Sequence, residues 1–399
     1  MLTPPRRRLV LLGIFVLGIC GLLASLGLTA TLTDEVYAEE MVSICKDSPT
    51  ISERELCYQK HVPKIMDEGV TMERAFRITQ LILDNDPQYQ SCHVLAHLLT
   101  AKEVGKDPSK WKDVVMRSPT GFCGTGALHG AFQERFRIES MPDADVDTLR
   151  GMLEGVCDPR DSWHPTLLDR SSCVHGMGHL FLYVTDADVK KSVELCGALA
   201  KLSDFDFRQT CYEGVFMQAN QPLEAEDEIL IRNIASSTKN PQKFCAQFEY
   251  GLVRDTCLKE SWAQDSKTVT TAEGFERLCK QTSPEYVPYC ASANIFATIE
   301  TLHYDLPKIK DLCRSMKDQL FKDSCWARTA VKYIWADERN VHKAVAVCED
   351  APAESKDMCW KSLTEYAQQG WQKGYAVSKQ LCESMPEPYG SACTTATAL

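Results

Sequence analysis

The sequence has no low-complexity tract and no excess of basic residues. With 44% hydrophobic and 25% charged residues among 399, its composition is that of a folded protein, which excludes widespread disorder. Its formal net charge of −11 argues against nucleic-acid binding, because that function requires clusters of lysine and arginine. The length allows two or more domains, or one extended array of repeats.

Several common catalytic and cofactor motifs are also missing. There is no zincin HExxH pattern, no CxxCH sequence for haem attachment and no GxSxG nucleophile elbow. The glycine-rich stretch GFCGTGALHG is not followed by the Lys-Ser or Lys-Thr of a phosphate-binding loop. No protein nucleophile stands out either.

A long apolar segment lies near the N-terminus. Residues 9–30 carry no charge, follow three arginines and are numerous enough for a helix to cross a bilayer. Basic residues before the segment and acidic residues after it predict a cytoplasmic N-terminus and a periplasmic or extracellular bulk. We therefore expect residues 1–35 to form a cytoplasmic tip and a single-pass membrane anchor. The alternative is a signal peptide that ends at Ala38.

Cysteine is the most regular feature of the remaining sequence. All but one of the 19 cysteines follow the apolar segment, which leaves an even number on the side that we expect to be oxidising. In the C-terminal half they form pairs 11 or 12 residues apart, and successive pairs are offset by 34 or 35 residues. A fixed period of this size is typical of a repeat array with one supersecondary unit per period.

Each period is interpreted as a helix A, a polar turn and a helix B, with a disulfide that joins the end of A to the start of B. A short turn places two antiparallel helices side by side, so their cysteines come within bonding range. A loop of about a dozen residues closed in this way contributes roughly 3 kcal/mol to stability. The predicted disulfides of this kind are Cys45–Cys57, Cys157–Cys173, Cys196–Cys211, Cys245–Cys257, Cys279–Cys290, Cys313–Cys325, Cys348–Cys359 and Cys382–Cys393.

Two cysteines do not fit this pairing of helix A with helix B. Cys92 and Cys123 both stand at the start of a predicted helix B, and the helices A before them carry no cysteine. We expect a Cys92–Cys123 disulfide between neighbouring repeats, because an oxidising compartment disfavours spare thiols. The alternative is that both remain thiols.

The period, the helix pairing and the cysteine placement together resemble extracytoplasmic, disulfide-stapled helical repeat proteins of the Sel1-like and tetratricopeptide kind. The resemblance covers most of residues 40–399. It implies an all-α fold, a right-handed array of antiparallel helix pairs, and assigns no functional residue. We expect histidine-rich repeats at 36–220 and cysteine-stapled repeats at 221–399, with a helix at 224–238 marking the boundary.

Histidines gather in the first of these parts and follow the cysteine register. When the helix-B cysteine of each repeat is numbered zero, four successive repeats place His or Glu between positions +1 and +6. Two histidine pairs have i, i+4 spacing, so each pair shares a helix face with Cβ atoms roughly 5–6 Å apart and can bind one ion. Because equivalent positions of stacked helices line one surface, we predict a metal site there. The predicted ligands are His93, His97, His129, His175, His179 and Glu213.

Glycine recurs beside these ligands, although a glycine within a helix costs about 1 kcal/mol relative to alanine. We infer that helix backbones, or a ligand, approach each other closely there. The glycines are Gly124, Gly126, Gly130, Gly176, Gly178 and Gly214.

Ligand type does not separate zinc, iron and copper, since imidazoles with one carboxylate suit all three. Five or six ligands exceed one structural zinc site, so we expect one or two transition-metal ions in an open or dinuclear site. Met177 and Met217 lie beside the motifs and would favour copper. Tyr212 and Gln218 are predicted to hold the ligands in orientation. The alternative is a hydrogen-bonded polar core without an ion.

Two functions are consistent with these patterns. The first is a membrane-anchored extracytoplasmic metalloprotein, with redox or hydrolytic activity if it is an enzyme. The second is a non-catalytic, disulfide-stapled scaffold that binds another protein of the cell envelope on its repeat surface, with structural histidines. The first requires the predicted ligands to meet in one pocket.

Overall fold

The computed structural model describes residues 32–119, 122–123, 126–136, 151–159, 163–201, 204–222 and 225–398. Within these ranges the regular structure is helical, and the only extended pairings are two isolated β-bridges. The expectation of an all-α fold is therefore confirmed for this part of the chain. Residues 9–30, predicted to be a membrane anchor, lie outside these ranges.

The expected membrane localisation is not supported and is corrected. Over the described ranges, no helix combines the length and the apolar character needed to cross a bilayer. The longest helices there have 18 residues each and include charged side chains, such as Asp169 and Arg170 in one and Arg328 and Lys332 in another. The disulfides described below fit an oxidising compartment outside the cytoplasm.

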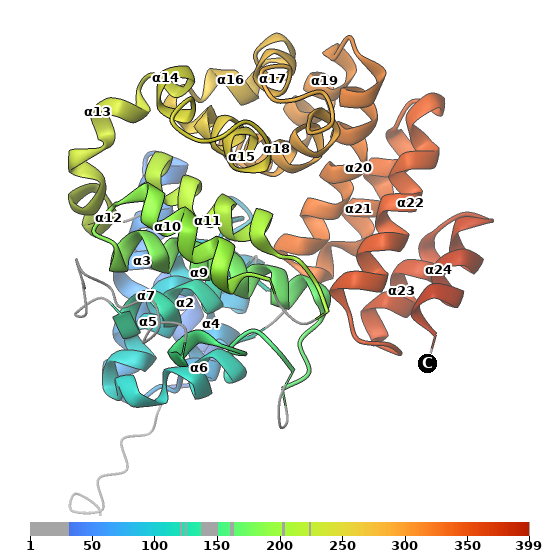
Figure 1. Cartoon of the computed structure of the whole chain (residues 1–399). Helices are drawn as coiled ribbons and strands as arrows, with labels where there is room; N and C mark the ends of the chain where they lie inside the picture. Colours follow the sequence, from blue (N-terminus) through green and yellow to red (C-terminus); the bar gives the residue numbers. More distant parts are fainter. Residues whose placement is uncertain are drawn as a thin grey trace, which may run out of the picture.

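The helices follow one another around the molecule (Figure 1). The first half contains α2 (Asp34–Cys45), α3 (Ile51–His61), α4 (Met72–Asn85), α5 (His93–Lys106), α6 (Trp111–Arg117), α7 (Gly126–Phe136), α9 (Leu167–Val184), α10 (Val189–Leu199) and α11 (Arg208–Asn220). The short helices α12 (Ala225–Leu230), α13 (Ala235–Thr238) and α14 (Pro241–Cys245) lead to α15 (Leu252–Glu260), α16 (Lys267–Thr270), α17 (Ala272–Cys279) and α18 (Val287–Thr301). The chain continues through α19 (Leu306–Ser315), α20 (Gln319–Ala336), α21 (Val341–Asp350), α22 (Ala353–Gly370), α23 (Ala376–Ser384) and α24 (Tyr389–Thr397). Short 3-10 helices are η1 (Val62–Glu68), η2 (Pro108–Lys110), η4 (Ile231–Asn233), η5 (Ser261–Gln264) and η6 (Glu338–Asn340).

Local sequence explains where several helices begin. Thr33, Thr50, Thr71 and Thr166 each precede a helix, and each hydroxyl accepts a hydrogen bond from the backbone N–H three residues later. At α9 the Asp169 side chain also accepts from the Thr166 backbone N–H, which completes a capping box. A cap of this kind stabilises a helix by about 1 kcal/mol. The start of α9, a helix with two predicted ligands, is therefore well defined.

Nine cysteine pairs lie at disulfide-bonding distance, and they are the nine pairs predicted from the sequence. Most of them join one helix to the next, as Cys313 of α19 and Cys325 of α20 do. Cys92–Cys123 instead joins the residues just before α5 and just after α6, close to the start of α7. It therefore links two neighbouring histidine-bearing helices.

The helical array curls back on itself, so that part of the second half lies against the first (Figure 1). Arg339 donates to both carboxylate oxygens of Asp84, at 2.6 and 2.8 Å, although the two residues are 255 positions apart. Phe122 pairs with Asp337 in an antiparallel bridge, and α22 packs on α9. These contacts close the array around a cavity of about 470 Å³.

An inner row of helices surrounds this cavity: α5, α7, α9, α11, α15, α18 and α20 all contribute to its lining. In this row α5 packs on α7, α7 on α9, α9 on α11, α11 on α15, and α18 on α20. The apolar core falls into two clusters, one from Tyr37 to Leu258 and one from Val269 to Cys393. The division of the chain at residue 220 stays a prediction.

Candidate metal centre

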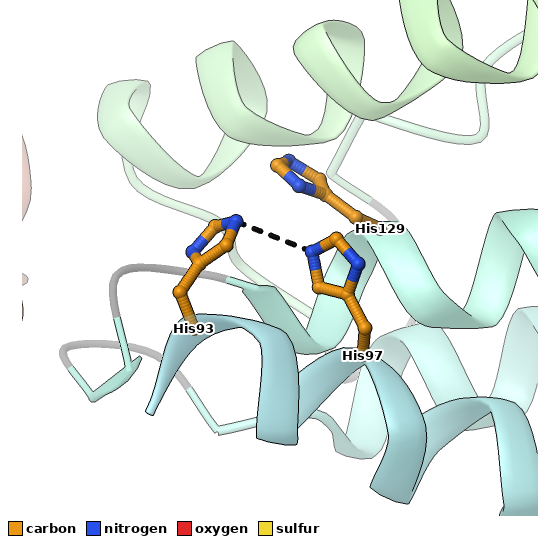
Figure 2. A group of neighbouring side chains, drawn as sticks. All are labelled: His93, His97 and His129. Atoms are coloured by element: carbon orange, nitrogen blue, oxygen red, sulfur yellow. Dashed lines mark hydrogen bonds between the residues drawn. The ribbon is translucent and has the colours of Figure 1, made fainter. Parts of the chain in front are cut away.

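Three histidines from two neighbouring helices lie in an arrangement that could hold a metal ion (Figure 2). His93 and His97 are one turn apart on α5, and His129 faces them from α7, with one ring nitrogen of each within 4.8 Å of the others. The Nε2 atoms of His93 and His97 are 3.2 Å apart. Metal–nitrogen bonds of about 2.0–2.1 Å place ligand nitrogens roughly 3.3 Å apart in a tetrahedral site. The His93–His97 pair therefore has the spacing that one ion requires, and His129 lies within 4.8 Å of both.

His175 and His179 extend this group from α9. Their ring centroids are 4.8 Å apart, and each centroid is 5.3 Å from that of His129. The rings of His93 and His97 lie 5.3 and 5.2 Å from the ring of His129. The structure thus brings all five predicted histidines into one cluster, with His129 between two i, i+4 pairs.

Glycines allow the helices of the cluster to pack with their backbones in close contact. A Cβ on Gly130 would lie 2.1 Å from the carbonyl oxygen of His97, and a Cβ on Gly214 would lie 2.1 Å from that of His175. Real Cβ atoms do not approach other atoms within 3.0 Å, so only glycine fits at these positions. The close approach predicted from the repeated glycines is confirmed, and it ties α7 to α5 and α11 to α9.

Burial keeps the imidazoles of the cluster neutral. Burial lowers the pKa of His93 to about 3, and the neighbouring His97 adds to this effect. Burial also lowers the pKa of His97 and of His179 to about 4. The pKa values of His129 and His175 are well below the usual value, first because of burial and then because of neighbouring histidines. Neutral imidazole is the form that binds metal ions. All five side chains are therefore in the ligand state at neutral pH.

Two ring nitrogens of the cluster are buried without a hydrogen-bond partner among the described residues: Nδ1 of His129 and Nε2 of His179. The opposite nitrogens are engaged, since Nε2 of His129 lies 3.3 Å from the Ser172 carbonyl oxygen and Nδ1 of His179 donates to Oε1 of Gln218 at 2.5 Å. Such bonds select the tautomer whose other nitrogen has a lone pair to offer. Leaving a buried polar atom unsatisfied costs about 1–3 kcal/mol, a cost that a bound ion would remove.

Of the two residues expected to orient the ligands, Gln218 contacts His179 directly. Tyr212 has a different environment, because its hydroxyl lies 3.7 Å from the Cβ position of Gly197 and so faces α10. Met177 is buried with its sulfur 3.6 Å from that of Cys157, which places it against a disulfide. Met217 lines the cavity.

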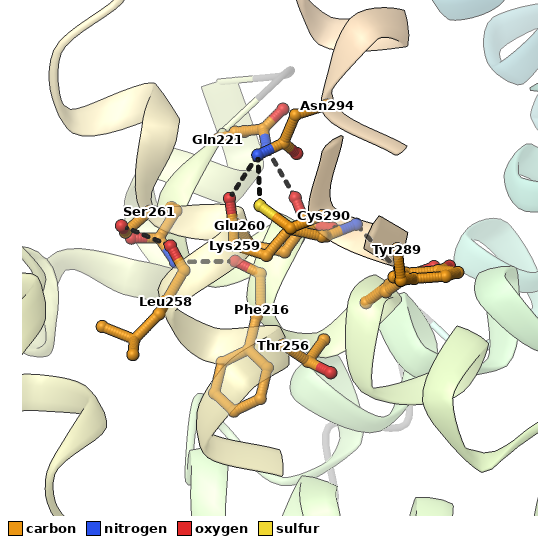
Figure 3. Close-up of polar contacts among 12 residues, drawn as sticks. Phe216, Gln221, Thr256, Leu258, Lys259, Glu260, Ser261, Tyr289, Cys290 and Asn294 are labelled. Atoms are coloured by element: carbon orange, nitrogen blue, oxygen red, sulfur yellow. Dashed lines mark hydrogen bonds and ion pairs between the residues drawn. The ribbon is translucent and has the colours of Figure 1, made fainter. Parts of the chain in front are cut away.

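Glu213 lies on the cavity wall, but its carboxylate is held by the protein. It accepts hydrogen bonds from Nζ of Lys259 at 2.9 Å and from the Tyr289 hydroxyl at 2.7 Å. Lys259 also pairs with Glu260 at 2.6 Å, and Asn294 donates to the Lys259 carbonyl oxygen at 3.3 Å (Figure 3). Because this network already compensates its charge, we leave Glu213 out of the ligand set proposed below.

Lys259 is not among the site residues predicted from the sequence, although its position follows the cysteine register. It stands two residues after Cys257, at the same position in the cysteine register as Glu213 after Cys211. Lys259 of α15 and Glu213 of α11 therefore occupy equivalent positions on neighbouring helices and form an ion pair. Their side chains are only 6% and 10% exposed.

The second half of the chain supplies the wall of the cavity that faces the histidines. Trp335 of α20 stacks on His93, with ring centroids 6.3 Å apart and an interplanar angle of 26°. Nζ of Lys332 lies 3.7 Å from the centroid of a Trp335 ring and 2.6 Å from the Glu300 carboxylate. No motif in the sequence points to Trp335, because its contact with His93 depends on the curvature of the whole array.

Comparison with protein-family models, curated proteins and solved structures found no match. The resemblance to Sel1-like and tetratricopeptide proteins is therefore supported only as an all-helical chain with nine disulfides. The chemistry of the site is the basis for assigning a function.

Proposed function

We propose that this protein binds a transition-metal ion through His93, His97 and His129, in an oxidising compartment outside the cytoplasm. The observation that carries this proposal is the convergence of three neutral imidazoles, with ring nitrogens within 4.8 Å of one another, beside a cavity that His93 and His129 line. The buried Nδ1 of His129, which has no hydrogen-bond partner in the described ranges, supports it further.

The ligand set favours a reactive site over a purely structural one. Structural zinc sites are usually closed by four protein ligands, whereas catalytic sites keep three and leave a position for water or substrate. Here two of the three imidazoles, His93 and His129, line a cavity, and His175 and His179 provide two more ligands for a second ion next to the first. Zinc, iron and copper all suit imidazole ligands, and the corresponding activities are hydrolytic or redox.

The architecture belongs to the same proposal. We propose that the helix pairs form one right-handed repeat array, in which the histidine-bearing repeats at 36–220 present the ions and those at 221–399 cover them. The contact between Trp335 and His93 supports this division of roles.

The test is the metal content of protein purified without a histidine tag and with its disulfides intact. The wild type should retain stoichiometric metal after dialysis against zinc, iron or copper in separate experiments, measured by inductively coupled plasma mass spectrometry. His129→Ala should lose it, because His129 contacts both histidine pairs. His342→Ala is the matched control, since His342 is exposed on α21 and should keep the wild-type metal content.

Circular dichroism and a non-reducing gel would show that each variant is folded and oxidised. A folded wild type that holds no more of any of the three metals than His129→Ala would refute the metal site. Under that result the histidines are structural, and the scaffold function is the remaining one.

A further inference from the structure

The cavity beside the histidine cluster is lined by a cation that forms no direct ion pair with the residues that the structure describes. Three basic side chains line it: Lys259, Lys332 and Arg328. The two lysines are paired with glutamates, at 2.6–2.9 Å. Arg328 makes no hydrogen bond or ion pair with any part of the chain that the structure describes, and its Nε atom is buried without a partner.

The Arg328 side chain is partly buried and has no direct counter-ion in the described part of the chain, which is unfavourable. Arginine stays protonated at neutral pH, and a buried charge without a counter-ion is strongly disfavoured. The compensating contact on α18 is weak: Cζ of Arg328 lies 4.7 Å from the centroid of the Phe296 ring, and cation–π contacts contribute about 0.5–2 kcal/mol. A guanidinium stacked on a ring still has the donors along its edge, and these match the two oxygens of a carboxylate or phosphate.

Arg328 lies on the same helix, α20, as Trp335, which contacts the histidine cluster. On α20, Lys332 follows it by one turn and Trp335 by about two, and Trp335 stacks on His93. With a rise of 1.5 Å per residue, Arg328 and Trp335 are on the order of 10 Å apart along the helix axis. The cavity of about 470 Å³ is far larger than one inorganic ion and is within the range of pockets for small organic molecules.

We propose that this cavity binds a small organic anion, whose carboxylate or phosphate group is held by Arg328 while its other end reaches the histidine cluster. Trp262, Tyr289, Phe296 and Trp335 also line the cavity and would pack against an apolar or aromatic body. That the other end of the anion reaches a metal ion rests on the proposed function. The anion subsite itself depends only on the environment of Arg328. The substrate class of the proposed metalloprotein is then a small organic acid.

The experiment is a fluorescence titration of the full-length, disulfide-intact protein, since two of the cavity-lining residues are tryptophans. The probes are benzoate and inorganic phosphate, with uncharged benzamide as the matched control for benzoate. At least one anion should change the fluorescence saturably, whereas benzamide at the same concentration should not. Binding should weaken at least roughly tenfold in Arg328→Gln, as expected for a lost charge-assisted hydrogen bond, and recover in part in Arg328→Lys.

The control variant is Lys379→Gln, which removes a cation whose side chain is 77% exposed on α23 and should bind as the wild type does. Without ligand, Arg328→Gln should unfold at the same or a higher temperature than the wild type, because it removes an unpaired charge. If neither anion binds saturably, or if binding is equal in Arg328→Gln, the anion subsite is refuted.

Metal content measured on the same samples separates the two proposals. Arg328→Gln should keep its metal, since Arg328 is not among the proposed ligands. Stoichiometric metal without anion binding would refute the anion subsite and leave the metal site standing. If the protein holds no metal but binds an anion in a way that depends on Arg328, the metal site is refuted and the anion subsite remains.

Discussion

Alanine at position 130 would place a Cβ 2.1 Å from the carbonyl oxygen of His97 and 2.5 Å from its Cα. Ordinary van der Waals contacts of a Cβ begin at about 3.4 Å, so α7 would have to move away from α5 by about 1 Å. This movement would carry His129 away from His93 and His97. Since metal–ligand distances tolerate only about 0.2 Å, the three imidazoles of Gly130→Ala would no longer close on one ion.

The effect on metal binding should exceed the effect on stability. Overpacking a helix contact costs about 1–3 kcal/mol, and replacing a helical glycine by alanine returns about 1 kcal/mol. The net loss in the free energy of unfolding should therefore be about 0–2 kcal/mol. Disturbing a group that merely orients a ligand already lowers metal affinity by about 10–100-fold, so displacing a ligand should lower it by at least roughly 100-fold.

Competition with a chromophoric chelator would measure the affinity, and urea unfolding of the metal-free protein would measure the stability. Gly105→Ala is the matched control, because it lies on α5 and its Cβ would meet only Oε1 of Glu134, at an ordinary 3.4 Å. That variant should bind metal as the wild type does and gain up to about 1 kcal/mol. Wild-type metal affinity in folded Gly130→Ala would refute the inference that this helix contact sets the ligand geometry.

Two further predictions concern buried charge. The pKa values of His97 and His179 are about 4 in the folded protein against an ordinary 6.5, so between these pH values the unfolded chain binds more protons. The free energy of unfolding of the metal-free protein should therefore fall as the pH drops from 6.5 to 4, by up to about 1.4 kcal/mol per pH unit for each histidine, and a flat profile in urea unfolding would contradict their burial. Lys259→Met should cost roughly 3–5 kcal/mol, because it leaves two buried glutamates without their cation. Lys280→Met, whose side chain is 51% exposed, should cost about 0–1 kcal/mol, so equal losses in thermal unfolding would count against the buried network.

The parts of the structure that were predictable from the sequence are those determined by local geometry. A disulfide requires two cysteines close together in space, so the regular spacing of eight cysteine pairs indicated the helix pairing. The Cys92–Cys123 bond was instead inferred from the oxidising compartment, which disfavours spare thiols. The i, i+4 spacing brings His93 and His97 to one face of α5 regardless of the rest of the fold. Because α7 packs on α5 in the array, His129 of α7 lies next to these two histidines.

Features that depend on the sum of many small rotations were not predictable. Each helix pair turns the array by an amount that no short motif specifies, so neither the return of Trp335 to His93 nor the Arg339–Asp84 ion pair has a signature in the sequence. The partner of Glu213 was also missed. A carboxylate next to histidines suits a metal ion and a buried lysine equally well, and only the contact with Lys259 distinguishes the two.

The closure of the array also has a consequence for biosynthesis. The helices that carry the five histidines are complete before α18 and α20 emerge, since chain growth runs from the N-terminus and Asp84 precedes its partner Arg339 by 255 residues. During that interval Trp335 is not yet there to cover His93. If the cluster binds an ion as proposed, that ion would reach His93 without the cover that Trp335 gives it in the finished protein. Metal supplied during folding should be incorporated faster than metal added afterwards.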